Sequence, residues 1–245
     1  MRALVTRPRD DAAEISEALS TRGFEVVTAP MLIIESTGAV PDLDGAQAVM
    51  FTSANGARAF ATATPERDIP VFTVGDATAK CALSLGFGRV ESAGADSLAL
   101  VRLVGATLDP AAGAVVHGCG EAVVGDPAGL LEAAGFTVRR AVLYRAAGAL
   151  ALDPATGDLL GAGSLDMVLF FSPRAAQTFV ILTEQAGLAA ACGGLSAICL
   201  SPAVADAAIG GGSGPAWRVV RTAQRPDMAA LLEEVDAEAA RPNAE

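Results

Sequence analysis

Six short turns of small polar residues contain most of the groups in this sequence that could bind a ligand. They are Thr6-Arg7-Pro8, Thr52-Ser53-Ala54-Asn55, Gly75 to Thr78, Gly118 to Gly120, Ser172-Pro173-Arg174 and Ser201-Pro202. Each follows an apolar run typical of a buried strand, so we expect each turn at the carboxyl end of a parallel strand. A single turn of this kind is most often only a helix cap. Six turns at equivalent sheet positions would line a cleft between two domains with N–H and O–H donors, which suits a ligand with several carboxylates.

A second candidate for chemistry is Tyr144, the only tyrosine, which follows the extended run Arg140-Ala141-Val142-Leu143. A tyrosine at a strand end is usually a packed side chain with its hydroxyl in water. This chain, however, has one histidine, His117, and one lysine, Lys80, which is expected on a helix surface. We therefore interpret Tyr144 as the best-placed neutral proton donor.

Other catalytic and cofactor sites are disfavoured. His117 has no second histidine beside it and no G-x-S-x-G serine elbow accompanies it, so a structural role is expected. The glycines around Cys119 do not fit the dinucleotide-binding pattern. The four cysteines contain no CxxC pair, which predicts buried reduced thiols and no metal site. We expect no cofactor.

Composition limits the class of protein. A chain of 245 residues can form one large or two ordinary domains. The net charge of −11 and the lack of a basic cluster make a nucleic-acid partner unexpected. No apolar run reaches the roughly 18 residues that span a membrane, and the start of the chain lacks a secretory pattern. These features predict a cytoplasmic protein without a membrane partner.

The chain contains an internal duplication. Ser53 matches Ser172 and Phe60 matches Phe179, both at a separation of 119 positions (172 − 53 and 179 − 60). A second match, at 112 positions, aligns Gly23 with Gly135 without a gap (135 − 23). Strands alternate with helices in both halves, which predicts two parallel α/β sheets.

The second match also shows where the halves differ. At 112 positions Val5 aligns with His117 and Arg7 aligns with Cys119. The second half therefore lacks an arginine where the first half has one.

Taken together, these motifs resemble the uroporphyrinogen-III synthase family over nearly the whole chain. The resemblance rests on Thr6-Arg7-Pro8, Gly23, Pro30, Phe51-Thr52-Ser53-Ala54-Asn55, Val74-Gly75 with Thr78-Ala79, Gly86, Gly135 with Tyr144-Arg145, and Phe171-Ser172-Pro173. It implies two flavodoxin-like α/β domains joined by a two-stranded linker. One domain would comprise 1–33 and 148–245 and the other 34–147, with linker strands near 31–37 and 143–150.

The resemblance also implies a reaction without a cofactor. Hydroxymethylbilane, a linear tetrapyrrole with eight carboxylates, would close to uroporphyrinogen III with loss of water and inversion of the last pyrrole ring. Tyr144 matches the family's candidate acid. The expected substrate-binding residues are Arg7, Thr52, Ser53, Asn55, Gly75, Thr78, Gly118, Gly120, Arg145, Ser172, Arg174 and Ser201.

Three features depart from the family pattern. One is the segment from Gly118 to Pro127, which is rich in glycine and contains the acids Glu121 and Asp126. Relatives often carry arginine where this chain has Cys119, so either one carboxylate contact is missing or Arg145 or Arg174 supplies it. Many relatives keep a hydroxyl where this chain has Val204.

Two other functions are considered. One is a two-domain ligand-binding or sensor protein without chemistry, and the other is a nucleotide-dependent transferase, which the missing phosphate loop disfavours. A monomer is expected in any case.

Overall fold

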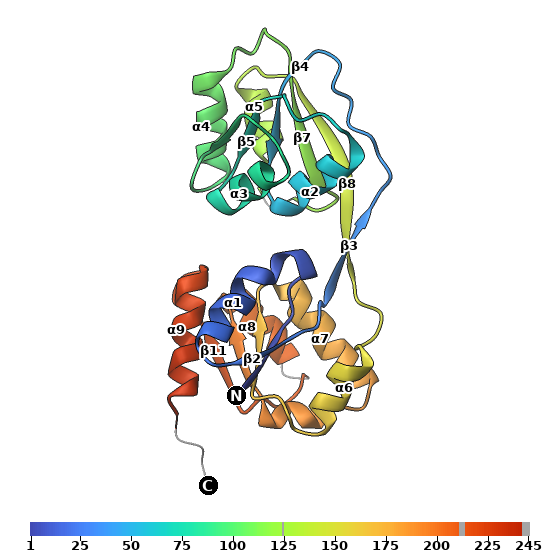
Figure 1. Cartoon of the computed structure of the whole chain (residues 1–245), viewed down its shortest axis with the longest axis vertical. Coiled ribbons are helices and arrows are strands. Elements are labelled where there is room, and N and C mark those ends of the chain that lie inside the picture. The colour runs from blue at the N-terminus through green and yellow to red at the C-terminus, as the bar shows by residue number, and fades with distance from the viewer. Residues whose placement is uncertain (124, 211–213, 242–245) are drawn as a thin grey trace. The chain divides into compact units, whose positions relative to one another are not determined.

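The computed structural model describes residues 1–123, 125–210 and 214–241 (Figure 1). It divides into two compact units. The first unit comprises Met1–Ile33 and Ala147–Glu245, and the second unit comprises Ile34–Ala146.

The first unit is built on a five-stranded sheet in the order β11-β10-β9-β1-β2. Its strands are β1 (Arg2–Val5), β2 (Glu25–Thr28), β9 (Met167–Phe170), β10 (Ser196–Cys199) and β11 (Val219–Thr222), and every neighbouring pair is parallel. Helices α1 (Ala13–Thr21) and α9 (Met228–Ala239) pack on one face of the sheet. Helices α6 (Pro154–Gly161), α7 (Pro173–Gln185) and α8 (Pro202–Ile209) pack on the other. The described part of the unit also contains the 3-10 helices Arg9–Asp11 and Ala189–Gly194.

The second unit contains a six-stranded sheet in the order β3-β8-β7-β4-β5-β6. Its strands are β3 (Leu32–Ser36), β4 (Ala46–Phe51), β5 (Val71–Thr73), β6 (Val90–Ser92), β7 (Ala114–Gly120) and β8 (Val138–Gly148). Helices α2 (Ala54–Ala63) and α3 (Asp76–Ser84) cover one face, and α4 (Ser97–Thr107) and α5 (Pro127–Ala133) cover the other. Strands β3 and β8 carry the chain from one unit to the other.

Both sheets follow one strand order. Counted along the chain, the first sheet reads 2-1-3-4-5 from β2 to β11, the order of flavodoxin-like folds. When β7 and β8 are numbered 1 and 2, and β4, β5 and β6 are numbered 3, 4 and 5, the strands β8-β7-β4-β5-β6 also read 2-1-3-4-5. The predicted α/β fold with two parallel sheets is therefore confirmed.

The duplication extends to side-chain geometry. The Phe51 and Phe60 rings lie 5.4 Å apart at 68°, and the Phe170 and Phe179 rings also lie 5.4 Å apart at 68°. Each pair comes from a central strand and the helix that follows it. A third ring completes each cluster, Phe87 in the second unit and Trp217 in the first. One packing arrangement thus forms the core behind both serine-bearing turns.

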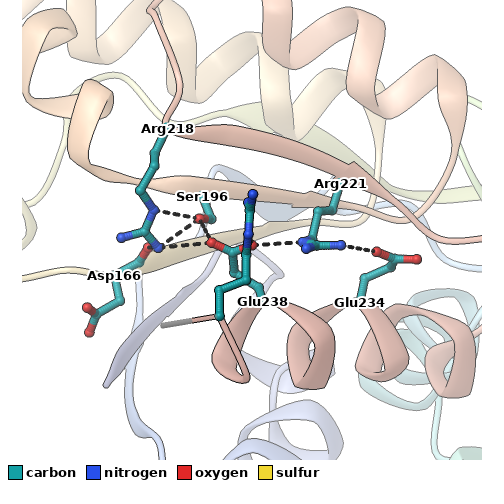
Figure 2. A network of polar contacts seen from close by, with 7 residues as sticks. Asp166, Ser196, Arg218, Arg221, Glu234 and Glu238 are labelled. Atoms are coloured by element: carbon teal, nitrogen blue, oxygen red, sulfur yellow. Dashed lines mark hydrogen bonds and ion pairs between the residues drawn. The ribbon is translucent and has the colours of Figure 1, made fainter. Parts of the chain in front are cut away.

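The buried carboxylate of Glu238 connects α9 to the sheet of the first unit through hydrogen bonds and ion pairs (Figure 2). The Glu238 side chain is only 2% exposed. Its carboxylate accepts hydrogen bonds from Ser196 Oγ at 2.6 Å and from Arg221 Nε at 2.8 Å, and pairs with Arg218 at 3.2 Å. Because Ser196 begins β10, this network lies at the amino ends of the strands, away from the polar turns.

We expect Glu238→Gln to destabilise the protein by about 1.5–3 kcal/mol at pH 7, the range for hydrogen bonds to a charged group. Burial raises the pKa of the Glu238 carboxyl, but hydrogen bonds from Ser196 and Arg221 outweigh burial and hold the pKa below its usual 4.5. The folded protein then binds fewer protons than the unfolded chain at this site. The carboxylate therefore stabilises the fold above about pH 4.5, and this contribution is lost as the pH falls through the lowered pKa.

Urea unfolding at pH 7 and pH 3.5 measures both effects. The difference between wild type and Glu238→Gln should shrink at the lower pH. Glu233→Gln, on the exposed side of α9, is the control and should match wild type. Equal midpoints for Glu238→Gln and wild type at pH 7 would contradict the role of the network.

In the part of the chain that the structure describes, no helix combines the length and the apolar character needed to cross a membrane.

Candidate active site

The clearest polar constellation lies at the carboxyl ends of the strands of the second unit. Tyr144 of β8 places its hydroxyl 2.9 Å from Ser53 Oγ, at the start of α2. Ser53 Oγ also accepts a hydrogen bond from Gly56 N at 3.1 Å as the N-cap of α2. Because the cap fixes the serine, the serine in turn fixes the tyrosine hydroxyl. Both side chains remain partly exposed, so a ligand can reach them.

Three glycines allow this close packing. A Cβ at Gly120 would lie 2.8 Å from two carbons of the Tyr144 ring, and one at Gly118 would lie 2.7 Å from the Phe51 ring. A Cβ at Gly56 would meet the Gly118 carbonyl oxygen at 2.5 Å. Strand β7 can therefore support both α2 and the Tyr144 ring only while these positions lack side chains.

Thr52 connects this constellation to the lone histidine. Its Oγ1 lies 3.4 Å from His117 Nε2. His117 is buried, and among the described residues its Nδ1 has no hydrogen-bond partner. Burial is the main cause that lowers the pKa of His117 to about 4; the charge of Arg140 acts in the same direction, and Asp126 opposes the shift. The imidazole is therefore neutral at pH 7.

The β5–α3 turn offers backbone donors. Gly75 is the N-cap of α3 and supplies no side-chain hydrogen bond, whereas Ser53 caps α2. Thr78 is buried in the first turn of α3. The free N–H groups at this helix start can bind an anion. Asp76, also in the first turn, accepts a hydrogen bond from Ser92 Oγ at 2.7 Å.

Two further predicted residues of the second unit hold protein partners. Asn55 Oδ1 accepts a hydrogen bond from Arg58 at 2.7 Å. The Arg145 guanidinium pairs with Glu35 on β3 at 2.7 Å, and this hydrogen bond raises the pKa of Arg145. Arg140 approaches Cys119, with its Nη2 at 4.0 Å from Cys119 Sγ.

The first unit places its predicted residues at the equivalent edge of its own sheet. Arg7 stacks over the Phe171 ring at 5.0 Å. Ser172 caps α7 by accepting from Ala175 N at 3.2 Å, and Arg174 is exposed in the first turn of α7. Ser201 is the N-cap of α8 but makes no side-chain cap hydrogen bond, as at the equivalent helix α3.

The sequence reasoning did not place Arg140 among the binding residues. The β7–β8 register pairs it with His117, and both line a cavity of about 330 Å³. The one sequence feature that could have identified Arg140 as a binding residue is its position in the extended run before Tyr144.

Within residues 1–123, 125–210 and 214–241, no three His, Cys, Asp or Glu side chains are placed to hold a metal ion. The arrangement instead offers one oriented hydroxyl pair, a neutral imidazole and several N–H donors, which suit proton donation to a substrate held by its carboxylates.

Comparison with known proteins gives one family match. The family model described as "Uroporphyrinogen-III synthase HemD" matches residues 13–233. No curated protein sequence matches. A solved uroporphyrinogen-III synthetase from Helicobacter pylori is similar in fold, with a TM-score of 0.64, 16% identity, and coverage of 97% of this chain and 99% of that chain. A mutant uroporphyrinogen III synthase from Thermus thermophilus gives a TM-score of 0.48 at 16% identity, with coverage of 98% of both chains.

Proposed function

The chain belongs to the uroporphyrinogen-III synthase family, and on this premise we propose that it cyclises hydroxymethylbilane to uroporphyrinogen III. The reaction makes it a lyase, with loss of water and inversion of the last pyrrole ring. The family match over residues 13–233 is the observation that carries this function.

We assign proton donation to Tyr144. The substrate loses its terminal hydroxyl as water, which requires a proton on the departing oxygen. The Tyr144 hydroxyl is held 2.9 Å from Ser53 Oγ, so its direction is set before the substrate binds. The serine hydroxyl can donate a hydrogen bond to the tyrosine oxygen after the proton has left. Because the substrate is intrinsically reactive and closes unaided to the uninverted isomer, the remaining task is positioning.

Positioning rests on the substrate carboxylates. The N–H groups at the start of α3, which lacks a side-chain cap, suit a carboxylate. The start of α8 offers fewer donors, because Pro202 has no N–H and Val204 N donates to Ser201 O. Arg7 and Arg174 add guanidinium groups that can bind a carboxylate through two hydrogen bonds. The proposed binding residues come from both units and are Arg7, Thr52, Ser53, Asn55, Gly75, Thr78, Gly118, Gly120, Arg145, Ser172, Arg174 and Ser201.

The test is to incubate the protein with freshly made hydroxymethylbilane and to separate the isomers of the oxidised product by chromatography. The proposal expects type III above the type I that forms spontaneously. An isomer composition that is the same with and without protein would favour a binding protein without catalytic activity.

Gly120→Ala is expected to lower kcat by about 10- to 100-fold, because misplacing a reacting group by about 1 Å can cost this much. The new Cβ would lie 2.8 Å from the Tyr144 ring, which must shift and so disturb the 2.9 Å contact between its hydroxyl and Ser53 Oγ. Gly88→Ala is the matched control, since a Cβ there meets nothing within 4 Å. Equal kcat values for the two variants would show that the ring position does not matter for turnover.

We further propose that the protein acts in the cytoplasm as a monomer without a nucleic-acid partner. Cys81, Cys119, Cys192 and Cys199 are all free thiols, as is usual in a reducing compartment. The net charge of −11 opposes binding to a polyanion such as DNA. Light scattering should give a mass near the 24.5 kDa of one chain, and twice that mass would contradict the monomer.

A further inference from the structure

The two repeats differ in the residue that follows or ends one strand, β1 in the first unit and β7 in the second: the first has an arginine there and the second does not. In the first unit Arg7 follows β1 and lies over Phe171. At the repeat distance of 112 positions (119 − 7), the second unit has Cys119, a buried thiol that cannot replace a guanidinium. Burial raises the pKa of this thiol, and the hydrogen bond and charge of Arg140 oppose the shift, so the thiol stays uncharged at pH 7.

Arg140 lies close to Cys119, the position that corresponds to Arg7 of the first unit. It comes from β8, the strand beside β7, and its Nη2 reaches to 4.0 Å from Cys119 Sγ. The side chain is exposed, and the described residues contain no ion pair of Arg140. The guanidinium is therefore available to an outside anion, unlike that of Arg145, which pairs with Glu35.

A cavity of about 330 Å³ lies beside this guanidinium, within the second unit. Arg140 and the buried His117 both line it, and the β-sheet register places them opposite each other on β8 and β7. The Nδ1 of His117 is a buried polar atom that has no hydrogen-bond partner among the described residues. Leaving such an atom unsatisfied costs free energy, which a bound ligand can recover.

Two acidic residues, Glu121 and Asp126, also line the cavity. The Asp126 carboxylate is engaged as the N-cap of α5, where it accepts from Gly129 N at 3.0 Å. Glu121 lies close enough to Arg145 to raise the pKa of that residue. Arg140 is the one guanidinium among the described residues that line the cavity, so the cavity suits at most a single anionic group.

We propose that Arg140 and His117 together bind one carboxylate of the tetrapyrrole, taking the part in the second unit that Arg7 takes in the first. This inference rests on the proposed function. Thr52 Oγ1 lies 3.4 Å from His117 Nε2, and the proposal takes this hydroxyl as the donor, which puts the proton of the neutral ring on Nδ1. The carboxylate then accepts one hydrogen bond from Nδ1 and charge-assisted hydrogen bonds from Arg140.

Steady-state kinetics with hydroxymethylbilane test the role of Arg140. Arg140→Gln should raise KM about 10-fold with little change in kcat, because the contact binds substrate and transition state alike. Arg140→Lys should recover part of the loss. Arg139→Gln is the matched control, because Arg139 pairs with Asp42 at 3.1 Å, and it should match wild type. Equal KM values for Arg140→Gln and Arg139→Gln would overturn the proposal.

Nitrogen-15 NMR tests the role of His117, since a chain with one histidine gives one pair of imidazole signals. The free protein should show a protonated Nδ1 and an unprotonated Nε2. Uroporphyrin III, a stable octacarboxylate, should shift the Nδ1 signal, and Arg140→Gln should need about 10-fold more of it for half the shift. An unchanged Nδ1 signal at saturating uroporphyrin III would overturn the proposal.

The two experiments separate this inference from the proposed function. A protein that forms no type III isomer, yet binds uroporphyrin III through Arg140, would refute the reaction and keep the carboxylate site. A protein that forms type III with the same KM in wild type and Arg140→Gln would keep the reaction and refute the site.

Discussion

Tyr144→Phe is expected to lower kcat for hydroxymethylbilane by roughly 10- to 1000-fold, the scale of losing a general acid. The substitution removes one oxygen and keeps the ring that packs on Gly120. It also removes the hydrogen bond to Ser53 Oγ, which remains the cap of α2 through Gly56 N. The fold should therefore survive while proton donation to the departing hydroxyl is lost.

Stopped-flow or quenched assays of uroporphyrinogen formation measure this effect, with thermal unfolding as the check on the fold. Ser53→Ala provides the graded comparison, since it keeps the phenol but frees its direction, and it should lower kcat less than Tyr144→Phe. A Tyr144→Phe variant with the wild-type kcat would remove Tyr144 from the mechanism and leave the positioning role in place.

Phe60→Ala and Phe179→Ala should each destabilise their own unit by about 3–5 kcal/mol, the usual cost of deleting a buried phenylalanine. Both side chains are fully buried, and each lies 5.4 Å from its partner ring, Phe51 or Phe170. Because the two phenylalanine pairs share one geometry, the two losses should be similar. Each substitution leaves a cavity in place of the deleted ring. The neighbouring aromatic rings are rigid, so they fill this cavity poorly.

Urea unfolding and calorimetry, as two separate experiments, measure the two losses of stability. Leu83→Ala in the second unit and Ile181→Ala in the first are matched controls, because these side chains are 54% and 50% exposed. The controls should shift stability by less than about 1 kcal/mol. Losses for Phe60→Ala and Phe179→Ala that are no greater than those of the controls would contradict the assigned cores.

The repeated local patterns predicted the fold because they depend on neighbouring residues. An apolar run ended by Ser53 or Ser172 predicts a strand, a cap and a helix, and the structure has β4 with α2 and β9 with α7 at those places. Each serine accepts from the N–H three positions later, at Gly56 and at Ala175. The strand order is harder to predict from local sequence, because β1 pairs with β9 across 164 positions (167 − 3).

The contacts within the site depend on register, which local patterns do not determine. Tyr144 was identifiable as a candidate from its type, but its contact with Ser53 joins residues 91 positions apart. The pairing of Arg145 with Glu35 spans 110 positions, and the approach of Arg140 to Cys119 depends on the β7–β8 register. The roles of the predicted binding residues therefore stay predictions until substrate is bound.

The isomer ratio under enzyme excess is the most direct measurement of the central claim, that the protein directs ring closure by holding the substrate. With the protein well above hydroxymethylbilane in concentration, the fraction of type III should rise towards one for wild type. Tyr144→Phe should approach the same fraction at a higher protein concentration, because slower catalysis competes with spontaneous closure. A type III fraction that stays at the spontaneous level at every wild-type concentration would contradict the claim.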